Sequence, residues 1–375
     1  MTDVRSVVDR AGIDRLIELL RGRGYTVLGP TVRDEVIVYG EVGSTADFPV
    51  GVRDEQEAGQ YRLVQRDDAA LFGYVVGPRS PKSFLHPAEV PLWQAEQTGD
   101  GFRPIEPEPP PKYAFVGIRP CELAAVAVQD LVFLPDGRRD RVYGERRDGA
   151  FFVAVNCVEP GGTCFCASMG TGPKATEGYD LVLTEVIGEG WHRFVVEAGS
   201  EAGSEVLGEL EAAPADQDLA TRADSLLAEA ADHMGRTLDT EGLPEILIRA
   251  RDGREWERIA AKCLTCANCT LVCPTCFCAT VEDTTDLAGT IAGRTRRWDS
   301  CFNEEFSYIH GGPLRPSPYA RYRQWMTHKL STWWDQFGVS GCVGCGRCIT
   351  WCPVGIDITA EAAAIRASEE ARAGV

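Results

Sequence analysis

Eight of the chain's 15 cysteines fall into two runs with the same spacing. The runs are Cys263-Leu264-Thr265-Cys266-Ala267-Asn268-Cys269-Thr270-Leu271-Val272-Cys273-Pro274 and Cys342-Val343-Gly344-Cys345-Gly346-Arg347-Cys348-Ile349-Thr350-Trp351-Cys352-Pro353. Both read C-x2-C-x2-C-x3-C-P, the spacing that holds [4Fe–4S] cubanes. Zinc sites usually pair C-x2-C motifs without the C-x3-C-P tail. Two complete copies therefore favour iron–sulfur clusters and electron transfer.

The spacing also predicts which cysteines share a cluster. The first three of each run lie on one tight loop and reach different irons of one cube, as in bacterial-type ferredoxins. The fourth begins a helix, where the following proline is well tolerated, and points toward the other cube. The predicted ligands are Cys263, Cys266, Cys269 and Cys352 for cluster 1, and Cys342, Cys345, Cys348 and Cys273 for cluster 2.

Four further cysteines suggest a third [4Fe–4S] cluster, and they are Cys121, Cys157, Cys164 and Cys166. Each lies at the end of an expected strand or in a loop that contains glycine or proline. Thiolates in a reducing compartment are more often metal ligands than disulfide partners. The alternative is that they are structural, because free cysteines are often simply buried in a core. Cys276, Cys278 and Cys301 could supply ligands instead, or remain as free thiols that screen the two ferredoxin clusters.

Length and charge limit the possible functions. The 375 residues are enough for two or three domains, and 44% of them are hydrophobic. A formal net charge of −18 argues against nucleic acid as a partner, since nucleic acid is bound by basic patches. The first residues show no signal-peptide pattern, and no apolar run is long enough to span a membrane. We expect a cytoplasmic protein that does not contact a membrane.

The expected fold class is α+β. An N-terminal mixed α/β domain, residues 1–240, precedes a ferredoxin-like domain with two clusters, residues 241–375, whose two cysteine runs are separated by a long insert, residues 274–341. Apolar spacing predicts helices over residues 4–20, 123–133, 204–212, 219–238 and 244–261. It predicts strands over residues 25–28, 35–39, 71–76, 113–117, 151–155, 180–186 and 192–197, with a turn at Gly29-Pro30.

The insert is basic and aromatic within an acidic chain. Arg296, Arg297, Trp298 and Arg323 could form a docking surface for a partner protein, because arginine and aromatic residues are enriched at interface cores. The alternative is a solvated layer that shields the clusters. Neither G-x-G-x-x-G after a strand nor G-x4-G-K-[ST] occurs, so we expect no flavin or NAD(P) site in this chain. No nucleophile–base pair is visible, and we expect no catalytic residues.

With these residues in view, the chain resembles the beta subunit of cytoplasmic NAD(P)-linked nickel–iron hydrogenases of the sulfhydrogenase type. It is also similar to the iron–sulfur subunit of anaerobic sulfite reductase, in the same family. The resemblance runs from about residue 113 onward and rests on Gly117-Ile118-Arg119-Pro120-Cys121, Cys164-Phe165-Cys166-Ala167-Ser168-Met169-Gly170-Thr171, Cys273-Pro274-Thr275-Cys276-Phe277-Cys278, Trp298-Asp299-Ser300-Cys301, His328-Lys329 and the last cysteine run. It implies a relay that exchanges electrons with a flavin subunit handling NAD(P)H. The relay passes them toward the small and large subunits of a hydrogenase, or toward the catalytic subunit of a sulfite reductase.

Two other classes of function remain open from the residues alone. A free-standing ferredoxin-like carrier would account for the two runs, although a diffusing carrier needs no large N-terminal domain. A reductase with its own substrate site at an unusual cluster is kept open by the seven cysteines outside the runs.

Overall fold

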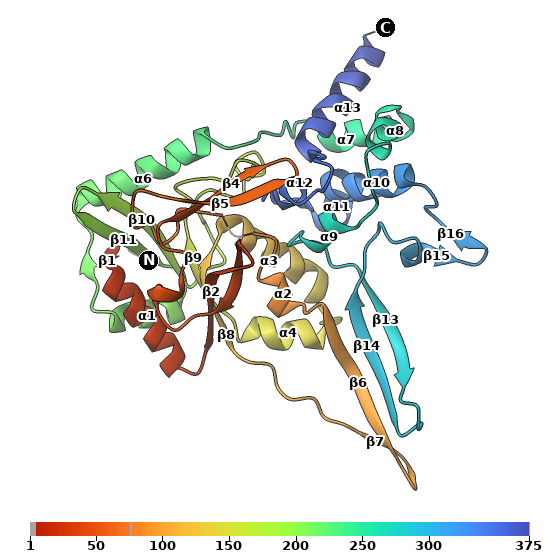
Figure 1. Ribbon diagram of the computed structural model, residues 1–375, viewed down its shortest axis with the longest axis horizontal. Helices are drawn as coiled ribbons and strands as arrows, with labels where there is room; N and C mark the ends of the chain where they lie inside the picture. The colour runs from red at the N-terminus through yellow and green to blue at the C-terminus, as the bar shows by residue number, and fades with distance from the viewer. Residues whose placement is uncertain (1–4, 76, 375) are drawn as a thin grey trace.

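A mixed eight-stranded sheet forms the centre of the N-terminal half of the chain (Figure 1). The structure is a computed structural model and describes residues 5–75 and 77–374. The strand order is β12-β1-β11-β10-β9-β8-β2-β3. The strands are β1 (Ser6–Val8), β2 (Thr26–Arg33), β3 (Val36–Glu41), β8 (Tyr113–Ile118), β9 (Phe151–Val155), β10 (Leu181–Gly188), β11 (Trp191–Ala198) and β12 (Ala213–Pro214). Strands β2, β8, β9 and β10 run parallel, and the outer pairs are antiparallel.

Helices cover both faces of this sheet. Helices α1 (Arg10–Gly22) and α5 (Glu201–Glu209) pack on one face, and α3 (Pro120–Phe133), α4 (Arg141–Asp148) and α6 (Gln217–Asp232) pack on the other. Every residue of β9 is buried, as expected for a parallel strand that is covered on both sides. The N-terminal region is therefore a mixed α/β structure, as predicted.

A second, four-stranded sheet projects from the body as an arm (Figure 1). Its strands are β6 (Glu89–Thr98), β7 (Gly101–Pro104), β13 (Ala279–Thr285) and β14 (Ile291–Trp298), in the order β13-β14-β6-β7. Antiparallel pairing of β14 with β6 joins the insert to the N-terminal half of the chain. The insert is thus not an independent layer, and the boundary that we place at residue 240 stays a prediction.

The cysteine runs lie in a small helical region near the C-terminal end. Its elements are α7 (Leu243–Arg249), η2 (Ala250–Asp252), α8 (Glu255–Ala260), α9 (Asn268–Leu271), η3 (Glu305–Ser307), β15 (Tyr308–Ile309), β16 (Gly312–Pro313), α10 (Pro318–Thr327), the π-helical turn η4 (His328–Thr332), α11 (Trp333–Phe337), α12 (Arg347–Thr350) and α13 (Ile358–Ala373). A core that includes Trp256, Phe302, Trp325 and Ile349 holds these short helices together.

The helices of the described residues are short. Helices α6 and α13 have 16 residues each. None of the helices in the described part of the chain is long and apolar enough to cross a bilayer.

The hairpin of β4 (Val52–Glu57) and β5 (Gln60–Gln65) connects the two regions. At its turn, Gly59 N donates to Ile349 O at 3.1 Å, and the ring of Tyr61 lies 5.1 Å from that of Trp351. The remaining elements are η1 (Thr45–Asp47) and α2 (Lys82–Leu85). Segments from the N-terminal half thereby pack directly against the second cysteine run.

Four local predictions were wrong. In the helix predicted over residues 4–20, residues 6–8 form β1, and α1 begins after Asp9, whose carboxylate caps Gly12 N; residue 4 lies outside the described residues. Strand β2 passes through the expected turn at Gly29-Pro30, and the chain reverses at Asp34-Glu35.

Residues 71–75 form no strand, and residue 76 is outside the described part of the chain. The N–H groups of Leu71 and Phe72 instead donate to the buried carboxylate of Glu185, at 2.6 and 2.9 Å. The helix predicted over residues 244–261 is interrupted at residues 250–254 between α7 and α8. The predicted strands at 113–117 and 151–155, the 180–197 hairpin and the helix at 123–133 are confirmed.

Candidate metal centres

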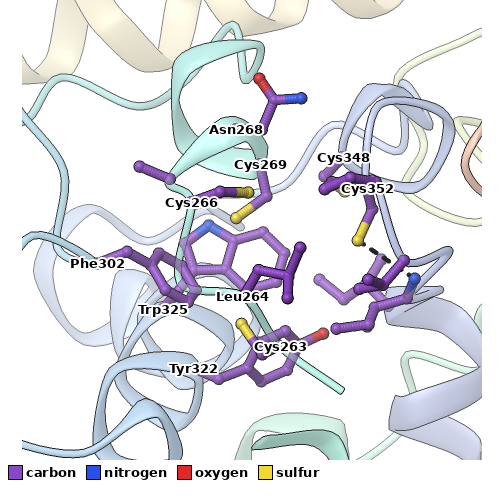
Figure 2. A pocket seen from close by; sticks show the side chains of 15 residues that line it. Cys263, Leu264, Cys266, Asn268, Cys269, Phe302, Tyr322, Trp325, Cys348 and Cys352 are labelled. Carbon is purple, nitrogen blue, oxygen red and sulfur yellow. Dashed lines mark hydrogen bonds between the residues drawn. The ribbon is translucent and has the colours of Figure 1, made fainter.

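The first cysteine run forms a loop whose thiols face a common cavity. Thr265 and Ala267 have positive φ angles of 51° and 66°, which turn the backbone before α9 begins. Figure 2 shows the side chains around this cavity. It is lined by Cys263, Cys266, Cys269, Cys348 and Cys352 together with apolar side chains that include Leu264, Phe302, Tyr322 and Trp325. The cavity is therefore a thiol-lined pocket with mostly apolar walls.

The fourth cysteine of the second run reaches the first loop, as the predicted crossing requires. The sulfur of Cys352 points into the cavity from the opposite side (Figure 2). Burial raises the pKa of Cys269 well above its usual value, and the nearby thiols of Cys263 and Cys352 raise it further. The structure thus brings the four thiols assigned to cluster 1 together, and their role as ligands stays a prediction.

The second cysteine run repeats this backbone in a more buried setting. Gly344 and Gly346 have positive φ angles of 64° and 72° and occupy the places that Thr265 and Ala267 hold in the first run. Burial raises the pKa of Cys348 well above its usual value, with further contributions from three neighbouring thiols, those of Cys342, Cys345 and Cys273. Cys273, from the first run, therefore lies with the three thiols of the second.

No single-ion site closes around these thiols. Within residues 5–75 and 77–374, no group of three or more His, Cys, Asp and Glu side chains is arranged to hold a metal ion. Cubane ligands differ from those of one ion, because each thiolate binds a separate iron at a separate corner of the cube. Four thiols grouped around each loop suit a cube, which these residues would hold through four sulfur atoms.

A loop of the N-terminal half packs tightly on the second run. Phe165 N donates to Gly344 O at 2.8 Å. A Cβ atom on Gly344 would stand 2.6 Å from Phe165 O and 2.7 Å from Cys166 N, and one on Gly346 would meet Thr163 O. Only glycine fits at these two positions, because backbone atoms of residues 163–166 occupy the space of a side chain.

The four cysteines assigned to a third cluster lie in one buried region. Cys121 and Cys157 follow β8 and β9, which are neighbouring parallel strands, so both stand at the same edge of the sheet. Burial raises the pKa of Cys166, and the thiols of Cys164 and Cys157 raise it further. Burial raises the pKa of Cys121, and the neighbouring thiols of Cys166 and Cys345 raise it further. The region therefore adjoins the second run, and its use as a cluster site stays a prediction.

Sequence reasoning missed a buried charge network between these two thiol groups. Glu122 accepts hydrogen bonds from Arg347 Nη2 and Tyr39 Oη, each at 2.6 Å. Arg119 donates to Phe72 O and Tyr74 O at 2.9 and 2.5 Å, and its Nη1 lies 3.8 Å from Cys157 Sγ. All three charged side chains are at most 3% exposed. Glu122 and Arg347 are far apart in sequence, so no local pattern could have paired them.

Two lysines and three cysteines form a further group near Cys273. Lys82 and Lys329 are only 5% and 3% exposed, and the thiols of Cys276, Cys278 and Cys301 lie close to them. Lys329 belongs to the His328-Lys329 motif noted in the sequence, whereas nothing in the sequence marks Lys82. The sequence alone does not decide whether these three cysteines are cluster ligands or free thiols.

The basic residues of the insert are engaged within the chain. Arg296 is 7% exposed and pairs with Asp140 at 2.6 Å. Arg297 pairs with Glu89 and Glu282, each at 3.1 Å. Trp298 Nε1 donates to His86 O, and Arg323 Nη1 donates to Arg251 O. The charge of Arg296 therefore stabilises the base of the arm, and docking through the more exposed Arg297 stays a prediction.

Comparison with known proteins identifies the cysteine region and a relative that covers about three quarters of the chain. Residues 262–356 match the family model described as a 4Fe-4S dicluster domain. The chain is 34% identical over 293 residues to the sulfhydrogenase 2 subunit beta of Pyrococcus furiosus, covering 76% of this chain and 79% of that protein. No solved structure matches. The dicluster domain implies two [4Fe–4S] clusters and a role in electron transfer, and it completes the predicted fold class.

Proposed function

The chain belongs to the family of the sulfhydrogenase beta subunits, and from this premise we propose that it relays electrons inside a multi-subunit nickel–iron hydrogenase. In this proposal a flavin subunit that handles NAD(P)H exchanges electrons with the chain's clusters. The small and large hydrogenase subunits stand at the other end of the relay. The relative is itself named as one subunit of a larger enzyme, so partner subunits are implied for it.

The observation that carries this proposal is the direct approach of the two thiol sets. Cys348 belongs to the second run, yet it lines the cavity of the first (Figure 2). Its pKa is raised first by burial, then by the thiols of its own set, and then by Cys269 of the other set. Two cubanes held as assigned would therefore be neighbours, with Cys348 shared between the surroundings of both. Such an arrangement supports electron exchange between the clusters.

The residues of the chain have distinct parts in this relay. When bound, the clusters supply one-electron chemistry. Cys263, Cys266, Cys269 and Cys352 would hold one cube, and Cys342, Cys345, Cys348 and Cys273 would hold the other. Phe302, Tyr322 and Trp325 close the first cavity against water. Lys329 is buried beside Cys273 and Cys342, and its positive charge would favour the more negative, reduced form of a cube held there.

We also propose that Cys121, Cys157, Cys164 and Cys166 hold a third [4Fe–4S] cluster. Their burial together at the carboxyl ends of β8 and β9, beside Cys345, supports a site that continues the relay into the N-terminal domain. Anaerobic iron analysis of Cys157→Ser should show a loss of about four irons per chain relative to the wild type. An unchanged iron content would mean that these cysteines are structural.

The relay itself is tested by separating the chain from its partners. The isolated, cluster-loaded chain should be reduced by dithionite and remain oxidised when NADH or NADPH is added, as followed by visible absorption. The complex purified with its native partners should be reduced by one of the two nucleotides. Direct reduction of the isolated chain by a nucleotide would show that it carries its own cofactor site, and a complex without a nickel–iron subunit would refute the hydrogenase assignment.

A further inference from the structure

Three cysteines outside the two runs are brought together by the ladder of the arm. Cys278 directly precedes β13 and Cys301 follows β14, and these strands pair antiparallel with Ala279 opposite Trp298. Asp299 N also donates to Cys278 O at 2.9 Å. The register of the ladder thus places Cys278 beside Cys301, and the two thiols form a hydrogen bond. Cys276 lies two positions before Cys278 in the sequence.

This trio lies between the two ferredoxin thiol sets. The Cys276 thiol forms a hydrogen bond with the sulfur of Cys273. On the side of the first set, the thiol of Cys301 interacts with Cys278, and Cys269 is a further neighbour of Cys301. Cys276 therefore approaches the second set, and Cys301 approaches the first.

Two buried ammonium groups face this trio without a carboxylate. Lys82 Nζ donates to Leu271 O at 3.1 Å and lies 3.9 Å from the centre of the Trp298 ring. Lys329 Nζ donates to Thr275 Oγ1 at 2.5 Å and to Gly341 O at 3.1 Å. Among the described residues, neither lysine is in a salt bridge with Asp or Glu.

The nearest anionic partners available to these lysines are sulfur atoms. Among the neighbouring charges, a thiolate at Cys276 would favour the charged form of Lys82 most, followed by one at Cys273. For Lys329 the order is reversed, with Cys273 ahead of Cys276. A buried charge is stable only when an opposite charge is close by. The second cubane can balance Lys329 through Cys273. Burial lowers the pKa of Lys82 to about 8, and a thiolate at Cys276 is the first negative charge that would favour its ammonium form.

We propose that Cys276, Cys278 and Cys301 hold an additional iron–sulfur cluster through three thiolates, with Lys82 as its counter-ion. Three thiolates from two segments can bind three irons of one cluster, and the Lys82 ammonium offsets part of their negative charge. The place of the trio beside Cys273 and Cys269 puts such a cluster within reach of both ferredoxin clusters. Its part in electron transfer rests on the proposed relay, whereas its presence can be measured without reference to that function.

The test is metal and sulfide analysis of the anaerobically purified full chain in which Cys278→Ala and Cys301→Ala are combined. Relative to the wild type, iron should fall by about three to four atoms per chain, with a matching loss of sulfide. The electron paramagnetic resonance signals of the two ferredoxin clusters should remain. Cys157→Ala serves as a comparison variant, because it removes a proposed ligand of the separate third cluster, and the iron losses of the two sites should add when the substitutions are combined. Unchanged iron, or loss of one zinc in place of iron, would overturn the proposal.

A second variant keeps the test decisive if the double variant fails to fold. Lys82→Met leaves all three ligands in place and removes the counter-ion, so one centre beyond the ferredoxin pair should become harder to reduce in a spectroscopic redox titration. Lys82→Arg should restore the wild-type titration. If Lys82→Met leaves every centre unchanged, the buried charge does not serve a cluster at this trio.

Discussion

The two cysteine runs share one backbone path and differ in what surrounds it. In the first run, Thr265 and Ala267 adopt positive φ angles although neither is glycine, and Leu264 beside them is 61% exposed. In the second, glycines hold the same places, and Val343 is 3% exposed. One loop stands at the surface, and the other is enclosed by residues of the N-terminal half.

This difference shows why one motif needs glycine and the other does not. The turn itself tolerates a side chain at either position, as the first run demonstrates, at a strain of roughly 1–2 kcal/mol per residue. Gly344 and Gly346 are required because the backbone of residues 163–166 lies against them. The glycines of the second run therefore reflect docking of the N-terminal domain and not cluster binding as such.

The strongest way to test the comparison is to remove the crossing ligands one at a time. Cys352→Ser should abolish the cluster of the exposed loop, and Cys273→Ser that of the enclosed loop, each with a loss of about four irons per chain. Electron paramagnetic resonance of the reduced variants distinguishes the two signals. If Cys352→Ser instead removed only the enclosed cluster, the crossed assignment would be wrong.

A large loss of stability is expected at the residue that follows the second glycine. Arg347→Met leaves Glu122 buried without its cation, and breaking a buried pair in this way destabilises by about 3–5 kcal/mol. Asn268 holds the equivalent place in the first run, where its Nδ2 donates to Trp351 O at 2.5 Å. Asn268→Ala should cost only about 1 kcal/mol. Chemical denaturation of the cluster-loaded chains measures both, and equal losses would contradict the contrast between the loops.

The glycine requirement can be tested with a matched pair. Gly346→Ala should destabilise by about 3 kcal/mol, because a positive φ is combined with a clash against the backbone of Thr163. The reverse change at the equivalent place, Ala267→Gly, should be neutral or stabilise by up to about 1 kcal/mol. Melting temperature and iron content together report the outcome. Tolerance of Gly346→Ala would mean that the 163–166 loop moves freely away from the second run.

A pH-dependent effect, small near neutral pH, distinguishes the arm from both loops. His86 is fully buried at the base of the arm, neither ring nitrogen has a hydrogen-bond partner, and burial lowers its pKa to about 3. The unfolded chain binds a proton here near pH 6.5 while the folded chain does not, so stability falls as the pH drops from about 6.5 toward 3. The slope from this residue is about 1.4 kcal/mol per pH unit.

His86→Phe should flatten this slope between pH 6.5 and 5 in urea unfolding experiments. The cluster signals should respond to pH as they do in the wild type. If the slope persisted in the variant, another group would be responsible for the acid sensitivity.

The parts of the molecule that the sequence predicts are those with a local signature. The cysteine spacing identifies the eight thiols that gather around two loops, and the apolar run at 151–155 identifies a buried central strand. The charge network of Glu122 and Arg347 and the two buried lysines escape such reasoning, because each depends on segments that meet only in the folded chain. Pairing of β6 with β14 is equally invisible, since strand signals carry no information about distant partners.

The arm also affects how the protein can be made. Residues 89–98 leave the ribosome long before residues 291–298, which β6 needs as its partner. At a synthesis rate of about 5–20 residues per second, the gap of about 200 residues corresponds to roughly 10–40 s. Throughout that interval β6 presents an unpaired edge, and Trp93, which is 47% exposed even in the finished arm, has no sheet to pack on. A nascent chain in this condition is prone to aggregate, and we expect the yield of folded protein to rise when chaperones are co-produced.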